Sequence, residues 1–80
     1  MRTKNETPRE WANTQYNLAL ARADLAELRP DEAEALLQQA KEGFLAAAEA
    51  YDDCGIEDEA AEAREKAQRV QAKIDALGAK

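Results

Sequence analysis

The chain is predicted to be all-α, with three antiparallel helices at about residues 8–28, 31–54 and 57–77. Two observations predict this class. The composition is dominated by alanine, glutamate, leucine, lysine and glutamine, which lose little side-chain entropy in a helix, while serine is absent. Apolar residues also recur at alternating steps of three and four, the period of an amphipathic helix. With 80 residues there is room for one small domain, which we place at 8–78 after a flexible lead-in at 1–7.

The first helix is expected to begin at Pro8. Thr7-Pro8-Arg9-Glu10 has the spacing of a capping box with proline at the first helical position. The apolar stripe predicted to face the core then consists of Trp11, Thr14, Leu18, Ala21, Leu25 and Leu28. Pro30 disfavours a helical conformation at Arg29, so the helix should end near Leu28.

The second helix is expected to be capped by Asp31 or Arg29 and to stop at Gly55, where Ile56 can fold back in a Schellman motif. Its predicted core stripe is Ala33, Leu37, Ala40, Phe44, Ala47, Tyr51 and Cys54. Gly43 lies in mid-helix, where it costs about 1 kcal/mol relative to alanine. We therefore expect another element to approach closely there: the first helix, the third helix or a second copy of the chain.

The third helix opens in the acidic run Glu57-Asp58-Glu59 and ends at Gly78. Its predicted core stripe is Ala60, Ala63, Ala67, Val70, Ile74 and Leu77. The short connections at Pro30 and Gly55 favour a folded-back bundle with antiparallel neighbours over a continuous coiled coil.

Charge and composition argue against several functional classes. The net charge is −6, and residues 30–55 hold one lysine against seven acidic side chains, which disfavours binding to nucleic acid. No apolar run is long enough for a membrane span, no secretory leader is recognisable, and a single cysteine, Cys54, agrees with a reducing compartment. We expect a cytoplasmic protein in which Cys54 is a buried small side chain.

The sequence also lacks the residues that common catalytic and metal sites use. Histidine is absent, so Ser-His and Cys-His nucleophiles and histidine metal sites are ruled out. The turn Asp53-Cys54-Gly55-Ile56 lacks the spacing of a phosphate-binding loop. Acidic pairs such as Glu57/Glu59 lie at helix ends, where capping explains them. We expect no enzymatic activity, no cofactor and no metal.

Two segments carry a resemblance to a known family. Asn17-Leu18-Ala19, followed by Ala21 and Leu25, precedes a small-aromatic-small series at Ala40, Phe44 and Ala47. Together with "TPREWANTQYNLA" they resemble a tetratricopeptide repeat (TPR) of the long-helix bacterial type. The likeness covers Thr7 to about Ala48, and it implies a helical hairpin for protein-protein interaction, with the third helix as the capping helix of a solenoid.

A second register of the same repeat is also open. Phe44, Ala48, Tyr51, Gly55, Ala60 and Ala67 fit a shorter unit made of the second and third helices. The chain has no second "TP..WA" segment, and it has Ala19 where a glycine is common in the family. We prefer the first register because the capping box and Trp11 lie inside it.

The resemblance also indicates candidate binding residues. In solenoids of this type the first helices form the concave face, which implies peptide contacts for Asn13, Tyr16, Asn17 and Leu20. The alternative is that these residues form an ordinary solvated helix face. Trp11 is expected to pack against the second helix near Ala47 and Tyr51 rather than to contact a ligand.

Three functional hypotheses follow. The first is a non-enzymatic TPR-type interaction or scaffold module that binds a protein or peptide, either as a module by itself or as a fragment or redesigned piece of a longer array. The second is a self-associating structural bundle, most simply a homodimer with two-fold symmetry, because about three repeats are normally needed for stability. The third is a three-helix adaptor resembling the MIT domain, with a groove for partner helices.

Overall fold

Residues 8–78 are described by a computed structural model, in which they form three helices in up-down-up order. α1 spans Pro8–Leu28, α2 spans Ala33–Asp53 and α3 spans Glu57–Gly78, and a 3-10 turn, η1 (Pro30–Glu32), precedes α2. The predicted all-α class and its three helices are confirmed. The lead-in at 1–7, and with it the Thr7 capping box, lies outside the described residues.

The start of α2 differs from the prediction. Glu32 occupies the N-cap position and makes no side-chain capping hydrogen bond, and Arg29 makes none at the start of η1. Pro30 accounts for the difference, because its fixed φ favours a tight first turn, here of the 3-10 type. Asp31 therefore belongs to η1, two residues before α2 begins.

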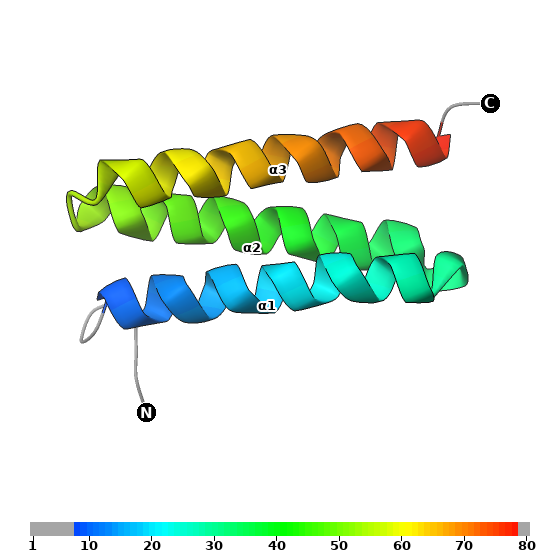
Figure 1. Ribbon diagram of the computed structural model, residues 1–80, viewed down its shortest axis with the longest axis horizontal. Coiled ribbons are helices and arrows are strands. Elements are labelled where there is room, and N and C mark those ends of the chain that lie inside the picture. The colour runs from blue at the N-terminus through cyan, green and yellow to red at the C-terminus, as the bar shows by residue number, and fades with distance from the viewer. Residues whose placement is uncertain (1–7, 79–80) are drawn as a thin grey trace.

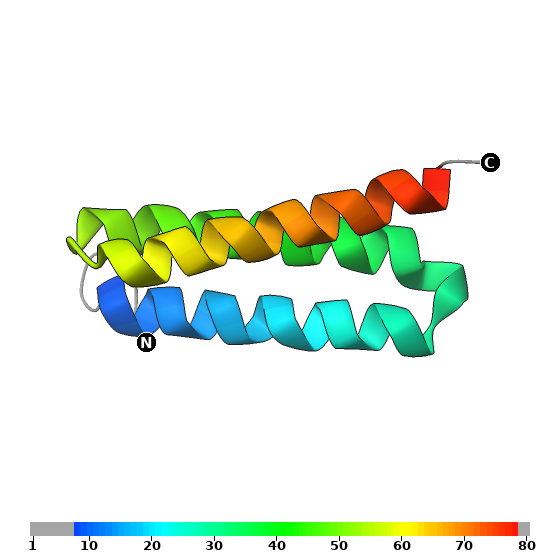
Figure 2. The ribbon, with the colours of Figure 1, turned by 45° about the horizontal axis from the view of Figure 1, so that its top comes forward.

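The helices form a flat slab. α2 lies between α1 and α3 and packs against both, whereas α1 and α3 have at most marginal direct contact (Figure 1). The Cα atoms extend over 43 × 25 × 13 Å. Figure 2 shows that the axes of α1 and α3 diverge toward the C-terminal end of α3. Each outer helix consequently has one packing partner within the chain.

The predicted core stripe of α1 is wrong. The residues that α1 buries are Ala12, Ala19 and Ala26, one every seventh position, and Trp11 is only half-buried. The other members of the predicted stripe are exposed: Thr14, Leu18, Ala21, Leu25 and Leu28. The helices are too close for leucine at their contact, so the smallest side chains mark the interface.

The predicted stripes of α2 and α3 are largely confirmed. α2 buries Ala33, Leu37, Ala40, Phe44, Ala47 and Tyr51, and α3 buries Ala60, Ala63, Ala67, Val70 and Ile74. Two predicted members differ, since Leu77 is exposed and Cys54 is only half-buried. Both lie at helix ends, where the neighbouring helix no longer covers them.

Gly43 identifies the closest approach in the fold. A Cβ added there would lie 3.1 Å from the Ala19 Cβ and 3.4 Å from the Gln15 carbonyl oxygen, both on α1. Of the three approaching elements considered, the structure selects the first helix. Trp11 packs, as predicted, against the cluster at the same end of the molecule that includes Ala47 and Tyr51.

The turn between α2 and α3 is the predicted Schellman motif. The Ile56 N–H donates to the Tyr51 carbonyl at 2.9 Å, and the Gly55 N–H donates to the Asp52 carbonyl at 3.0 Å. Gly55 has φ 76°, the only positive φ among the described residues. This left-handed residue reverses the chain and fixes the start of α3.

Replacing Gly55 by alanine is expected to lower the free energy of unfolding by about 1–2 kcal/mol, because a Cβ is disfavoured at positive φ. Urea denaturation followed by circular dichroism measures the change. Gly78→Ala is the matched control, because Gly78 has no positive φ and an added Cβ there meets no atom within 4 Å. Equal stabilities of the two variants would contradict the strain assigned to Gly55.

Candidate protein-binding groove

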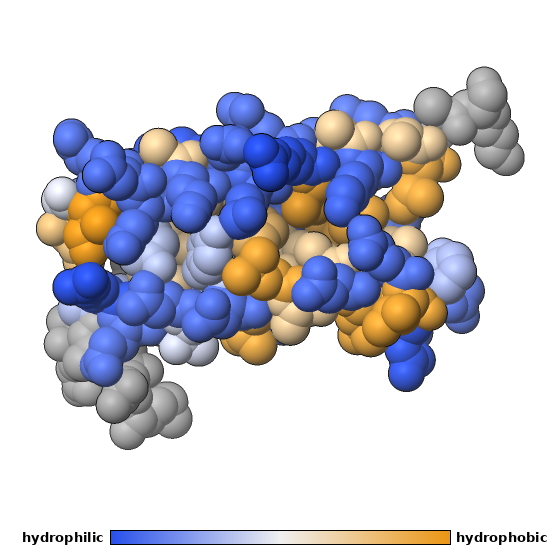
Figure 3. Space-filling model, viewed as in Figure 1, coloured by the Kyte–Doolittle hydropathy of each residue, from blue (hydrophilic) through white to orange (hydrophobic). Residues whose placement is uncertain are grey.

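A groove runs between α1 and α3 on the face shown in Figures 1 and 3, with α2 as its floor. It contains two hollows of about 190 and 330 Å³, and Lys73 lines both. Apolar side chains gather along this band of the surface (Figure 3). We call it the α1–α3 groove and define it by the residues that line the two hollows. The smaller hollow is lined by Leu20, Ala23, Asp24, Phe44, Lys66, Arg69, Val70 and Lys73, and the larger by Ala26, Glu27, Pro30, Ala33, Leu37, Lys73, Ala76 and Leu77.

An aromatic pair supports the middle of the groove. The rings of Tyr16 and Phe44 meet edge to face, with centroids 5.3 Å apart and planes at 70°. Phe44 is the largest side chain that is almost completely buried, at 1% exposure, while Tyr16 is half-buried. Edge-to-face pairs of this kind add stability beyond that of the buried area. Phe44, which lines the smaller hollow, thus fixes the position of Tyr16 beside it.

A polar cluster lies near the α2–α3 turn, outside the two hollows, and we call it the polar end of the molecule. The Tyr51 hydroxyl donates a hydrogen bond to the Asn13 side-chain oxygen, which ties α1 to α2. Burial raises the pKa of Tyr51, and the nearby carboxylate of Glu59 raises it further. Burial likewise raises the pKa of Tyr16, with a further contribution from Glu62. Both hydroxyls are therefore protonated at neutral pH, and the hydrogen of the Tyr51 hydroxyl is already donated to Asn13.

The smaller hollow has a basic edge. Lys66, Arg69 and Lys73 reach it from α3, whereas Asp24 is its one acidic lining residue. In a chain of net charge −6, this is a local concentration of positive charge. Arg69 also pairs with Glu65 at 2.6 Å on the exposed surface of α3, an arrangement that contributes little stability.

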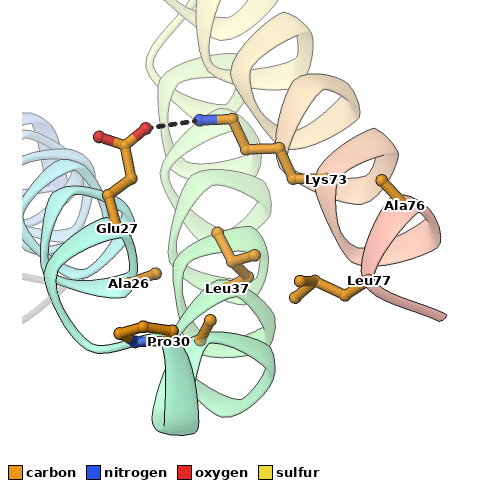
Figure 4. Close-up of a pocket in the computed structure, with 8 residues that line it drawn as sticks. Ala26, Glu27, Pro30, Leu37, Lys73, Ala76 and Leu77 are labelled. Atoms are coloured by element: carbon orange, nitrogen blue, oxygen red, sulfur yellow. Dashed lines mark ion pairs between the residues drawn. The ribbon is translucent and has the colours of Figure 1, made fainter.

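The larger hollow is apolar and lies where α1 and α3 diverge. Its lining residues converge from the end of α1, the start of α2 and the end of α3, and Leu37 forms its floor (Figure 4). Lys73 of α3 and Glu27 of α1 form a 3.5 Å ion pair across the opening of this hollow, and both side chains are more than half exposed. An exposed pair of this length is weak, so a ligand can displace it at low cost.

The structure places the four candidate peptide contacts at different depths. Leu20 lines the smaller hollow, whereas Tyr16 lines neither hollow and contacts Phe44, which lines the smaller one. Asn13 is exposed and accepts the Tyr51 hydrogen bond at the polar end. Asn17 is exposed and lines neither hollow.

Sequence reasoning missed the contribution of α3. Lys66, Val70 and Lys73 recur at steps of four and three and face the hollow together with Arg69. That spacing is visible in the sequence and predicts that they share one helix face. Only the fold shows that this face lies opposite Leu20 of α1.

The part of the chain that the structure describes contains no cluster of three or more acidic, cysteine or histidine side chains placed to hold a metal ion. Among residues 8–78, none of the helices combines the length and apolar character that crossing a lipid bilayer requires. Comparison of the chain with protein-family models, with curated proteins and with solved structures finds no match.

Proposed function

We propose that the chain is a non-enzymatic protein-interaction module of TPR type, and that its α1–α3 groove binds an apolar partner segment carrying acidic side chains. The observation that carries the proposal is the juxtaposition of an apolar floor with the basic edge of Lys66, Arg69 and Lys73. Concave apolar sites with a few well-placed polar groups are the usual form of binding sites.

The groove suits a peptide better than a small molecule. Its two hollows are joined at Lys73 and are open along their length between two helices. An amphipathic segment can place apolar side chains over Leu20 and in the larger hollow while its carboxylates meet the α3 cations. Near the α2–α3 turn, outside the two hollows, the carboxylates of Glu59 and Glu62 lie close to Tyr51 and Tyr16, which disfavours acidic partner residues there.

The TPR resemblance supports this proposal from the sequence side. The α1–α2 hairpin contains the small-aromatic-small series, and α3 packs on α2 as a capping helix would. The single cysteine fits a cytoplasmic setting.

The test is a selection of random 16-residue peptides against the full chain, followed by fluorescence anisotropy with the recovered sequences. We expect the recovered peptides to combine apolar with acidic residues. Lys66→Glu with Arg69→Glu should weaken their binding at least tenfold, because both substitutions reverse charge at the basic edge. Both side chains are at least partly exposed, so helicity should be unchanged.

A second variant tests the apolar part of the groove. Leu20→Asp should also weaken binding at least tenfold, since it puts a carboxylate over the floor. Leu45→Asp is the matched control, because Leu45 is 45% exposed on α2 and does not line the α1–α3 groove. Recovered peptides that bind all variants equally, or no enrichment above background, would refute the proposal.

A further inference from the structure

The outer face of α1 carries an apolar stripe that no described part of the chain covers. Leu18, Leu25 and Leu28 are 43%, 38% and 79% exposed, and Ala21 between them is also exposed. These four residues follow each other at steps of three, four and three, so they form one continuous strip along the helix. We call them the α1 seam. Trp11 and Thr14 extend the same spacing toward the start of α1.

The α1 seam has the pattern of a two-stranded coiled coil. Trp11, Leu18 and Leu25 occupy one heptad position, and Thr14, Ala21 and Leu28 occupy the other core position. The buried alanines of α1 lie on a different side of the helix, against α2. A second helix can therefore lie along the seam without displacing α2.

The charged residues beside the seam select both the partner and its direction. One flank carries Asn17 and Asp24, and the other carries Arg22 and Arg29. In a parallel pair of identical helices, a residue on the first flank faces the residue five positions later on the second flank of the other copy. Asp24 then faces Arg29 of the second copy, and Asn17 faces Arg22.

An antiparallel pair would bring like charges together. In that arrangement each flank meets the same flank of the other copy, so arginine faces arginine. Arg29 directly follows the last residue of α1: its N–H bonds to the Leu25 carbonyl at 3.0 Å, while its φ of −129° and ψ of 77° are not helical. Its 3.3 Å pair with Glu32 is exposed on both sides and easily exchanged.

We propose that two copies of this chain associate through the α1 seam as a parallel dimer with two-fold symmetry, paired by Asp24 and Arg29. The slab geometry gives a reason for such an association. α1 packs on α2 alone, and its fully buried residues there are only alanines. Small domains with a thin core commonly gain stability by oligomerisation.

Sedimentation equilibrium at micromolar concentration tests the association. We expect a mass of twice 8.8 kDa for the wild type. Leu18→Asp with Leu25→Asp should weaken dimerisation at least tenfold, whereas the control Leu45→Asp should not. A monomer at every concentration would overturn the proposal. The same result is expected if the seam binds a helix of another protein instead of a second copy, so that alternative also counts against the dimer. A dimer unaffected by the seam variants would overturn it as well.

Two variants test the parallel direction. In the parallel dimer, Asp24→Arg should weaken association, because the introduced arginine would then face Arg29 of the other copy. Adding Arg29→Asp should restore association, because the two charges are then exchanged. In an antiparallel dimer, Asp24→Arg would instead relieve repulsion and strengthen association. Leu28→Cys in a Cys54→Ala background should form an interchain disulfide, because identical positions meet only in the parallel form. Failure of the charge exchange and of the crosslink would refute the direction.

The dimer and the groove are separable. The four residues of the α1 seam line neither hollow, whereas Asp24 also lines the smaller hollow, so the groove is tested only through variants of Leu20, Lys66 and Arg69. The groove variants should leave the sedimentation mass unchanged, and the Leu18/Leu25 variant should still bind the selected peptides. Each proposal can consequently fail without the other.

Discussion

Phe44→Ala is expected to lower the free energy of unfolding by about 3–5 kcal/mol, the range typical of a fully buried phenylalanine. Phe44 is 1% exposed, and it packs within one cluster with Val70 of α3 and with Tyr16 of α1. It packs in a cluster with residues of all three helices and lines the smaller hollow of the groove. Its removal leaves a cavity that the surrounding alanines cannot fill.

The measurement for Phe44→Ala is urea denaturation followed by circular dichroism, with Leu45→Ala as the control. Leu45 is the next residue on α2 and is 45% exposed, so its truncation should cost much less. A domain of this size has a total stability of roughly 4–12 kcal/mol, so Phe44→Ala can consume most of it. Similar losses for the two variants would contradict the central role of Phe44. Tyr16 would also lose its edge-to-face partner, and peptide binding should fall with it.

Gly43→Leu is expected to lower the free energy of unfolding by about 1–3 kcal/mol, in the range of overpacked core sites. The first added carbon would already lie 3.1 Å from the Ala19 Cβ, and the remaining carbons would force α1 away from α2. Leucine has a better helix propensity than glycine by nearly 1 kcal/mol, which offsets part of the loss. The net effect therefore underestimates the steric cost.

The control for Gly43→Leu is Ala35→Leu, an exposed position on the same helix. Thermal and urea unfolding should show little change for the control and a clear loss for Gly43→Leu. An unchanged melting midpoint for Gly43→Leu would show that α1 and α2 do not approach as closely as described. Because α1 forms one wall of the groove, its displacement should also reduce peptide binding.

Local signals predicted the helices well. Pro30 and Gly55 each restrict the backbone of only one or two residues, so their effect can be predicted without knowledge of the fold. The same holds for the mid-helix glycine at Gly43, which correctly predicted a close approach. The stripe of α2 and most of the stripe of α3 were predicted correctly. On these two helices the buried residues are also those that form the apolar stripe visible in the sequence.

The stripe of α1 could not be predicted in the same way. This helix carries two interleaved stripes, one of leucines and one of alanines. Because leucine buries more apolar area than alanine, the sequence predicts that the leucine stripe faces the core. The fold buries the alanines instead, because Gly43 brings α2 within contact distance of Ala19. The leucines are left outside as the α1 seam.

Sequence alone determined the helical class, the approximate extent of the three helices and the turn at Gly55, because these depend on residues close together in the chain. Tertiary structure decided which side of α1 is buried, and it brought Leu20 of α1 opposite Lys66 and Val70 of α3. These residues are more than forty positions apart, and no local preference relates them. Their meeting depends on the distance between helices, which is set by the smallest side chains at the contact rather than by the most apolar ones.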